Sequence, residues 1–261
     1  MNEWTEKKVL IIGKAYPEPS KKYIETVCTG GITEDGDLVR LYPVPFRYWA
    51  QEKRYKVFSL IRVRMQKDAS DKRKESYRID QDSLEIVGHV ESWAERMSLI
   101  GPVIANSVEE LERRYRTDWT SLGLVRIRYD GFEWKWGASD WSLRKRAYMD
   151  QFLLFTPRMD LQHIPIKLIL RYKCADNPQC RGHSPRLIMW EYLETFRKWT
   201  QAGDAQSALD KMKSAIENRF SDQSKEPLAL VGTHCRYPVW LLGGLFFPPK
   251  QARQSLFDKF R

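Results

Sequence analysis

The sequence predicts an α+β protein built from two domains that are both rich in β-structure. Three observations support this fold class. The chain has 261 residues, more than one compact domain usually holds, and 42% of them are hydrophobic, enough to form two cores. Short stretches of alternating polar and apolar residues recur between Gly, Pro and Asp turns. Helical spacing of apolar residues is clearest in the second half. We expect a first domain at residues 1–140 and a second at 141–261.

In the first half, the run Val9 to Gly13 predicts a buried first strand. Residues 24–29 and 38–42 flank a Gly-rich and Asp-rich segment and predict a β-hairpin. Ser107-Val-Glu-Glu110 matches a capping box and predicts a helix over about 108–117. Period-two alternation predicts further strands at 57–66, 124–129 and 132–136.

The stretch 137–150 contains Gly, Ser, Asp and three consecutive basic residues without an apolar period, so we expect the domain boundary there. Residues 166–173 alternate again and predict the first strand of the second domain. Apolar residues at helical spacing then predict one helix around 188–199 and another over 205–220. Two closing strands are expected at 228–232 and 239–247, which makes the second domain α+β.

The charge of the chain indicates its class of partner. The formal net charge is +10 with an isoelectric point near 9.4, which attracts polyanions and nucleic acid above all. Met1 to Lys8 lacks the apolar region of a signal peptide, and no apolar run approaches the roughly 20 residues that span a bilayer. We therefore expect a cytoplasmic protein with no membrane partner. Four cysteines in a chain of this length do not indicate a disulfide framework.

A possible metal site is the sharpest local feature. Cys174-x5-Cys180-x2-His183 lies between a predicted strand and a predicted helix, and thiolate and imidazole are the ligands that structural zinc prefers. The fourth ligand is missing from this loop. We expect His234 or Cys235 to supply it, with His163 and Asp176 as alternatives. If no zinc binds, the two cysteines are free thiols.

Basic residues on the predicted strands form the second candidate site. Arginine and lysine side chains in register can contact successive phosphates, and nearby aromatic rings can stack on unpaired bases, as in single-strand-binding β-barrels. The residues that we expect to bind nucleic acid are Arg40, Tyr42, Arg62, Arg64, Arg126, Arg128, Lys167, Arg171 and Lys173.

A catalytic site is not evident. The sequence has no GxxxxGK[ST], GxGxxG, GxSxG or HExxH motif. Glu133-Trp-Lys135, with Asp118 or Asp130 upstream, is similar to the acidic and lysine residues of metal-dependent nucleases, but such triplets occur often by chance. We expect a binding protein rather than an enzyme. A metal-dependent nuclease and a non-catalytic adaptor in a larger complex are the alternatives.

Several short motifs together resemble the bacterial dual OB-containing family. The segment Cys28 to Leu41 is similar to the beginning of that family's pattern. Later matches are Tyr172-Lys-Cys174, Cys180-x-Gly182-His183, Trp190-Glu191, Val231-Gly-Thr-His234 to Pro238, Trp240, and Gly244-Leu-Phe-Phe-Pro248. Met189 stands where the family pattern has an acidic residue, which removes one potential metal-binding group.

The resemblance implies two OB-like barrels, the first within 1–140 and the second, with inserted helices and the Cys/Cys/His loop, within 141–261. It also implies that the protein binds or senses nucleic acid, in an antiphage or mobile-element system. Together with the charge, this predicts a protein that binds single-stranded or structured RNA or DNA, with other protein subunits as further partners.

Overall fold

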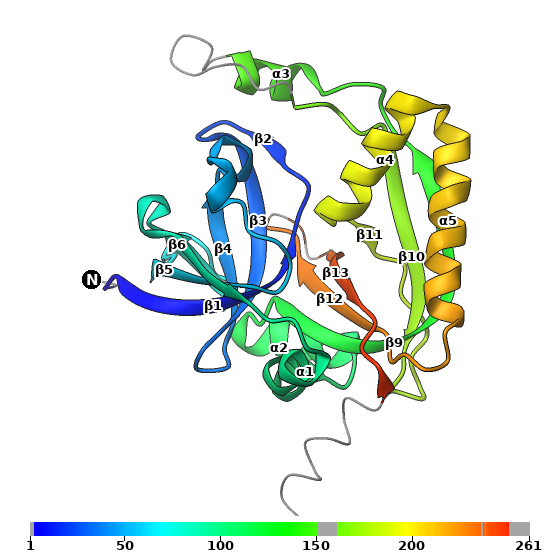
Figure 1. Ribbon diagram of the computed structural model, residues 1–261, viewed down its shortest axis with the longest axis horizontal. Coiled ribbons are helices and arrows are strands. Elements are labelled where there is room, and N and C mark those ends of the chain that lie inside the picture. Colours follow the sequence, from blue (N-terminus) through cyan, green and yellow to red (C-terminus); the bar gives the residue numbers. More distant parts are fainter. Residues whose placement is uncertain (1–2, 151–160, 236, 238, 251–261) are drawn as a thin grey trace, which may run out of the picture.

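A computed structural model describes residues 3–150, 161–235, 237 and 239–250. It confirms the α+β class and the two β-barrels, which lie side by side (Figure 1). The strands of the first barrel are β1 (Thr5–Lys14), β3 (Ile24–Thr33), β4 (Leu38–Val44), β5 (Ser59–Lys67) and β6 (Ser76–Ile79). They are ordered β1-β3-β4-β6-β5, and pairing of β5 with β1 closes the ring.

The second barrel repeats this plan. Its strands are β9 (Leu122–Trp136), β10 (Ile166–Cys174), β11 (Arg186–Leu187), β12 (Leu228–Thr233) and β13 (Trp240–Phe246). The order β10-β11-β13-β12-β9 closes where β9 pairs with β10. In both barrels the third and fifth strands run parallel, and the other pairings of the ring are antiparallel. Two five-stranded closed barrels of this kind are OB-like.

Helices and short strands surround the barrels. The strands are β2 (Glu18–Ser20), β7 (Glu85–His89) and β8 (Ile104–Ala105). The helices are α1 (Trp93–Ile100), α2 (Val108–Asp118), α3 (Leu143–Asp150), α4 (Trp190–Ala202) and α5 (Ala205–Ser221). The helix predicted over 108–117 is thus confirmed as α2, and both predicted helices of the second half are present. Apolar residues of α4 and α5, such as Phe196 and Met212, share one core with the inner side of β10.

The division between the two barrels differs from the expected boundary at residue 140. Strand β9 pairs with β12 along Leu122–Arg126 and with β10 along Ile127–Trp136, so it belongs to the second barrel. Strand β8 pairs with β9 as well, which puts the division near residue 103. The segment 137–150 resembles a linker in composition, but it belongs to the connection between β9 and β10 and includes α3.

The two barrels share a buried interface. One apolar cluster contains Leu10 and Ile12 of the first barrel together with Leu228 and Leu230 of the second. The two backbones approach so closely at Gly13 that an added Cβ atom would lie 2.6 Å from the carbonyl oxygen of Gly243. A glycine is therefore required at this point of the interface.

Buried polar groups also join the barrels. The backbone N–H of Ser121 donates to both carboxylate oxygens of Glu75, at 3.0 and 2.9 Å, and its hydroxyl group donates to Glu75 at 2.6 Å. Arg40 donates to the carbonyl oxygen of Ser121 at 3.0 Å. The loop that contains Glu75, residues 68–75, connects β5 to β6, so this loop of the first barrel is fixed against the second.

Candidate metal centre and basic barrel face

Four potential metal ligands converge beside the second barrel. The ligand atoms of Glu109, Cys174, Cys180 and His183 all lie within 4.8 Å of one another. They come from the first turn of α2, the end of β10 and the loop that follows β10. In the part of the chain that the structure describes, this is the one group of three or more His, Cys, Asp or Glu residues with such spacing.

Backbone groups hold the two thiols in place. Cys174 and Cys180 are both buried, and the N–H of Cys174 donates to Sγ of Cys180 at 3.2 Å. The N–H of Val108, at the start of α2, donates to Sγ of Cys174 at 3.4 Å. A turn places Cys180, since its N–H donates to the carbonyl oxygen of Asn177 at 3.1 Å. Both sulfur atoms therefore face the beginning of α2.

His183 returns to the end of β10 through a tight turn. Gly182 has φ +99°, a conformation that glycine adopts readily, and the backbones of His183 and Tyr172 then exchange hydrogen bonds of 2.8 and 3.0 Å. Nε2 of His183 is buried and makes no hydrogen bond, although it lies 3.1 Å from Oε1 of Glu109. This imidazole nitrogen, next to two thiols and a carboxylate, is therefore available as a metal ligand.

The surroundings set the charges of the ligands. Burial acts to raise the pKa of Glu109, but backbone and Ser107 hydrogen bonds, Cys180 and the charge of His183 together lower that pKa to about 2. Burial raises the pKa of the Cys174 thiol to about 12. The carboxylate is thus ionised, whereas the thiol stays protonated unless a cation displaces its proton.

The fourth ligand differs from the expectation. His234 stacks on Tyr237, with ring centroids 5.2 Å apart, and neither it nor Cys235 joins the group. Asp176 is engaged with Arg126 at 2.8 Å, and His163 packs against Trp141. The carboxylate comes instead from Glu109, because the capping box at Ser107 starts α2 beside the end of β10. The sequence signal was present, since Glu109 lies inside the recognised motif, but only the fold brings it to the cysteines.

A basic face covers the outer side of β9 and β10. Five exposed residues define this basic face: Arg128, Lys135, Lys167, Arg171 and Lys173. Lys135 lies directly opposite Lys167 in the strand register, and Arg128 lies directly opposite Lys173. None of the five forms an ion pair with any acidic residue that the structure describes. Four of the residues expected to bind nucleic acid are therefore brought together here, and Lys135 is an addition.

The other candidate residues are placed differently. Arg62 lies 3.2 Å from Glu85 and 3.8 Å from Glu6, and Arg64 forms an ion pair with Asp80. Carboxylates thus neutralise the basic strand of the first barrel. Tyr42 is 37% exposed and its hydroxyl group accepts a hydrogen bond from Thr26.

Two of the candidate arginines have structural partners. Arg40 is only 7% exposed, and its guanidinium group bonds to Ser121 at the barrel interface. Arg126 lies on the same side of β9 as Arg128, but it pairs with Asp176 at 2.8 Å and with Glu226 at 3.2 Å, so these two carboxylates neutralise its charge. The alternation predicted basic faces on both barrels, but the structure has one, because carboxylates neutralise Arg62, Arg64 and Arg126 and because Arg40 is buried at the barrel interface.

The residues considered for a nuclease do not form a cluster. Asp118 ends α2 and forms an ion pair of 2.9 Å with Lys74 of the first barrel. Glu133 lies opposite Ile169 in the register of β9 and β10, among the residues of the basic face. Among the described residues, no group of metal-ligating side chains contains either of them.

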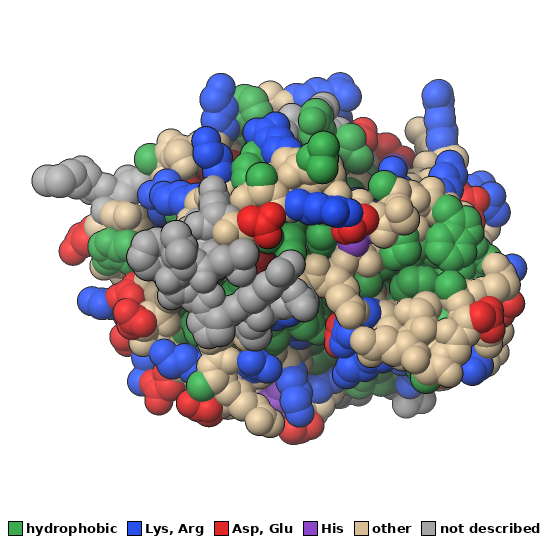
Figure 2. Space-filling model, turned by 90° about the horizontal axis from the view of Figure 1, so that it is seen from above, with side chains coloured by type: hydrophobic (Ala, Val, Ile, Leu, Met, Phe, Trp, Pro, Cys, Tyr) green, Lys and Arg blue, Asp and Glu red, His purple; other side chains and the backbone are tan. Residues whose placement is uncertain are grey.

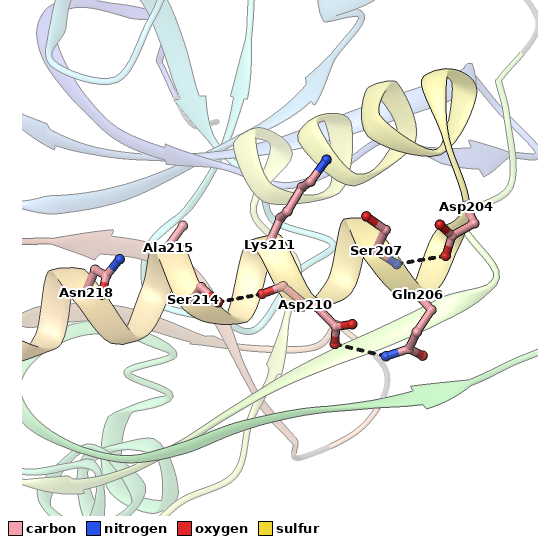
Figure 3. Close-up of a pocket in the computed structure, with 8 residues that line it drawn as sticks. All are labelled: Asp204, Gln206, Ser207, Asp210, Lys211, Ser214, Ala215 and Asn218. Carbon is pink, nitrogen blue, oxygen red and sulfur yellow. Dashed lines mark hydrogen bonds between the residues drawn. The ribbon is translucent and has the colours of Figure 1, made fainter.

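A shallow depression on α5 is also not a site. Figure 3 shows that its eight lining residues all come from α5 and its cap. Their polar groups already bond locally, as Asp204 accepts from the N–H of Ser207 at 2.8 Å and Gln206 donates to Asp210 at 3.0 Å. This is the solvated face of an amphipathic helix.

On the face that carries α3, Lys and Arg side chains lie beside an area of hydrophobic side chains (Figure 2).

None of the described helices is both long enough and apolar enough to cross a membrane.

Comparison with known proteins agrees with the two-barrel division. Residues 5–102 match the family described as Domain of unknown function (DUF8758), and residues 104–261 match Domain of unknown function (DUF8757). The two matched regions meet where the first barrel gives way to β8 and the second barrel. No curated protein matches the sequence. Since the second match covers more than half of the chain, the protein belongs to the family described as Domain of unknown function (DUF8757), here preceded by a DUF8758 domain.

Proposed function

We propose that this protein binds single-stranded nucleic acid along the basic face of its second barrel. The observation that carries the proposal is that two cross-strand pairs of β9 and β10 have like charges. Lys135 lies opposite Lys167, and Arg128 lies opposite Lys173. Like charges directly opposite each other weaken strand pairing by about 0.2–1 kcal/mol per pair. An anionic backbone lying between them removes that cost, and displacement of its counterions adds to the affinity.

Single strands suit this face better than a duplex. Trp136, at the end of β9, points to the side opposite Lys135, but it is 56% exposed at the rim of the barrel, where an unpaired base of a strand that passes over the rim can stack on its ring. OB-like barrels bind extended strands across the strands that here correspond to β10 and β11. Arg186 of β11 lies opposite Ile169 and extends the basic face by one strand.

The first barrel has a different role in this proposal. Its β5–β6 loop, one of the two loops that OB-like barrels use for ligands, is fixed at the barrel interface. There Arg73 donates to the carbonyl oxygen of Thr233 at 3.0 Å, and Lys74 pairs with Asp118. The first barrel therefore acts as a support for the second.

Fluorescence anisotropy with labelled single-stranded RNA and DNA and with duplexes tests this function. Contact with five phosphates gives a slope of about −3.5 for log K against log [salt], and removing three contacts reduces its magnitude by about 2. The test variant is Lys167→Gln/Arg171→Gln/Lys173→Gln. The matched control, Lys198→Gln/Lys211→Gln/Lys213→Gln, removes the same charge from exposed positions of α4 and α5.

The proposal fails if both triple variants bind the labelled single strands equally well. It also fails if the wild type binds neither single-stranded RNA nor single-stranded DNA. Adding Mg²⁺ separates the alternatives, because cleavage of the labelled strand would identify a nuclease. Absence of binding would favour an adaptor. A role in antiphage or mobile-element systems, which the family resemblance implies, stays a prediction.

We further propose that the metal centre holds structural zinc. Two thiolates, an imidazole and a carboxylate complete a tetrahedral zinc shell and leave no open position. Glu109, Cys174, Cys180 and His183 then join α2 to the end of β10, next to Lys173 of the basic face. A bound zinc ion would cross-link α2 to the end of β10, and the negative charges of the thiolates and of Glu109 would balance the charge of the ion.

Elemental analysis of protein purified without chelator measures the metal directly. We expect about one zinc ion per chain, and its loss in Cys180→Ser and Glu109→Ala. His234→Gln and Cys235→Ser, at the positions expected from the sequence, retain the metal. Zinc lost from the latter pair, or absent from the wild type, contradicts the proposed ligand set.

A further inference from the structure

A cavity of about 550 Å³ lies between the two barrels, apart from the basic face and the metal centre. Its lining comes from the first barrel, from α1, from the ends of α4 and α5, and from β13. A volume of this size falls in the range of small-molecule sites, and junctions between domains are a common place for them.

Aromatic rings form one wall of this interdomain cavity. Phe58 contacts Trp93 edge to face at 5.6 Å and Phe246 at 5.5 Å between ring centroids. Trp93 and Phe247 line the cavity and are only partly buried, whereas Phe58 is 8% exposed and its ring centroid lies 4.0 Å from the guanidinium group of Arg96. Phe58 has φ +69°, which strains a residue with a bulky side chain. Such strain concentrates at binding sites, where the surrounding structure holds it.

The charged part of the lining consists of two cations and two anions. Arg219 and Lys225 both line the cavity, beside the amide of Asn218. Asp222 keeps its negative charge while it accepts from the N–H and hydroxyl group of Ser224 at 3.0 and 2.5 Å, whereas the charge of Glu191 is neutralised by Lys14 at 2.8 Å. Since Lys14 neutralises Glu191, Arg219 and Lys225 exceed Asp222 by one positive charge and are the groups available to an anion.

We propose that the interdomain cavity binds a nucleotide, with its base against the Trp93 and Phe247 rings and its phosphate at Arg219 and Lys225. A flat aromatic body with one anionic group matches an aromatic wall next to two cations. The same chemistry is present in a free mononucleotide and in the phosphorylated end of a strand. This proposal does not depend on the basic face, because no residue of that face lines the cavity.

Isothermal titration calorimetry with AMP and UMP tests the site, using adenosine and inorganic phosphate as partial ligands. Arg219→Gln is expected to weaken nucleotide binding about tenfold, the effect of losing one charge-assisted hydrogen bond. Val57 lines the cavity from the loop before β5. Val57→Trp should therefore fill the cavity and abolish binding. Lys213→Gln, on the same helix as Arg219, is the matched control and should bind as the wild type does.

A trinucleotide with and without a 5′-phosphate distinguishes a strand end from a free nucleotide. If neither mononucleotides nor the phosphorylated trinucleotide bind the full chain, or if Arg219→Gln and Lys213→Gln bind alike, the proposal is overturned. Arg219 is exposed, so its variant is informative even if Val57→Trp does not fold. In every outcome, Arg219→Gln should keep the salt-dependent oligonucleotide binding of the basic face, so failure of either proposal is recognised separately.

Discussion

At the scale of single residues, Glu25 has a carboxyl group that is almost fully buried. It lies on β3, is 1% exposed, and accepts from Arg47 at 3.0 Å through one oxygen, while the other oxygen is buried without a hydrogen bond. Burial raises its pKa from 4.5 to about 7, against the opposing effect of the Arg47 charge. The folded protein therefore favours the protonated form.

This gives a pH dependence of stability with a definite sign. Because the folded pKa is higher than the unfolded pKa, the contribution of Glu25 is complete below pH 4.5 and is lost as the pH rises through 7. Urea unfolding at pH 5 and pH 8 should show wild type losing up to about 3 kcal/mol that Glu25→Gln does not lose. Glu52→Gln, at an exposed position, serves as the control and should follow the wild type.

The metal centre shows which residues a sequence can and cannot assign. Cys174, Cys180 and His183 were predictable, since their spacing within one loop reports short-range geometry. Glu109 was not, because 65 residues separate it from Cys174 and only the folded barrel brings α2 against the end of β10. The same reason explains Arg62 and Arg64, whose alternation predicted an exposed basic strand but not the acidic partners on other strands.

At the scale of the elements, a charge reversal in the β9–β10 pair should increase the stability of the protein and decrease its affinity for oligonucleotides. Lys167→Glu places a carboxylate opposite Lys135 and converts a repulsive cross-strand pair into an attractive one. We expect the free energy of unfolding to rise by about 0.5 kcal/mol while oligonucleotide affinity falls. Chemical denaturation and anisotropy measure the two effects. Lys211→Glu changes the charge equally on α5, and an equal gain in stability there would contradict the argument.

Most strands and the longer helices were predictable because their apolar residues repeat at the correct period. Helix α1 was missed although Ser92 accepts from the N–H of Glu95 at 3.1 Å, the same Ser-x-x-Glu signal that identified α2. It has eight residues, too few for a clear apolar period. The short edge strand β7 was also missed, since only its pairing with β5 makes it a strand.

At the scale of the whole molecule, the two barrels should unfold as one unit. Glu75 is 5% exposed and all its bonds to Ser121 cross the interface. Glu75→Ala leaves the N–H of Ser121 buried without a partner and removes the acceptor of its hydroxyl group, which should cost about 3 kcal/mol. Differential scanning calorimetry should then show two separate transitions in place of one. Glu52→Ala should keep the single transition, and a single transition in Glu75→Ala would show that apolar contacts alone join the barrels.

The boundary between the domains could not be read from composition. The segment 137–150 has the polar, glycine-containing character of a linker, whereas the true division near residue 103 lies between a helix and a short strand with no such signal. Local composition reports exposure. Membership of a barrel depends on which strands pair, and β9 pairs with β12, whose residues lie more than 100 positions away from their partners.

The bond between Glu75 and Ser121 also has a consequence for synthesis on the ribosome. The two residues are 46 positions apart, so at about 5–20 residues per second the nascent chain carries Glu75 for roughly 2–9 s before Ser121 is made. During that interval the β5–β6 loop has only its bonds within the first barrel, such as those from Lys67 to the carbonyl oxygens of Arg73 and Lys74, and lacks its bonds to Ser121. The first barrel therefore completes its folding only after the start of the second has left the exit tunnel, and slowing translation between these codons lengthens its exposure to chaperones and proteases.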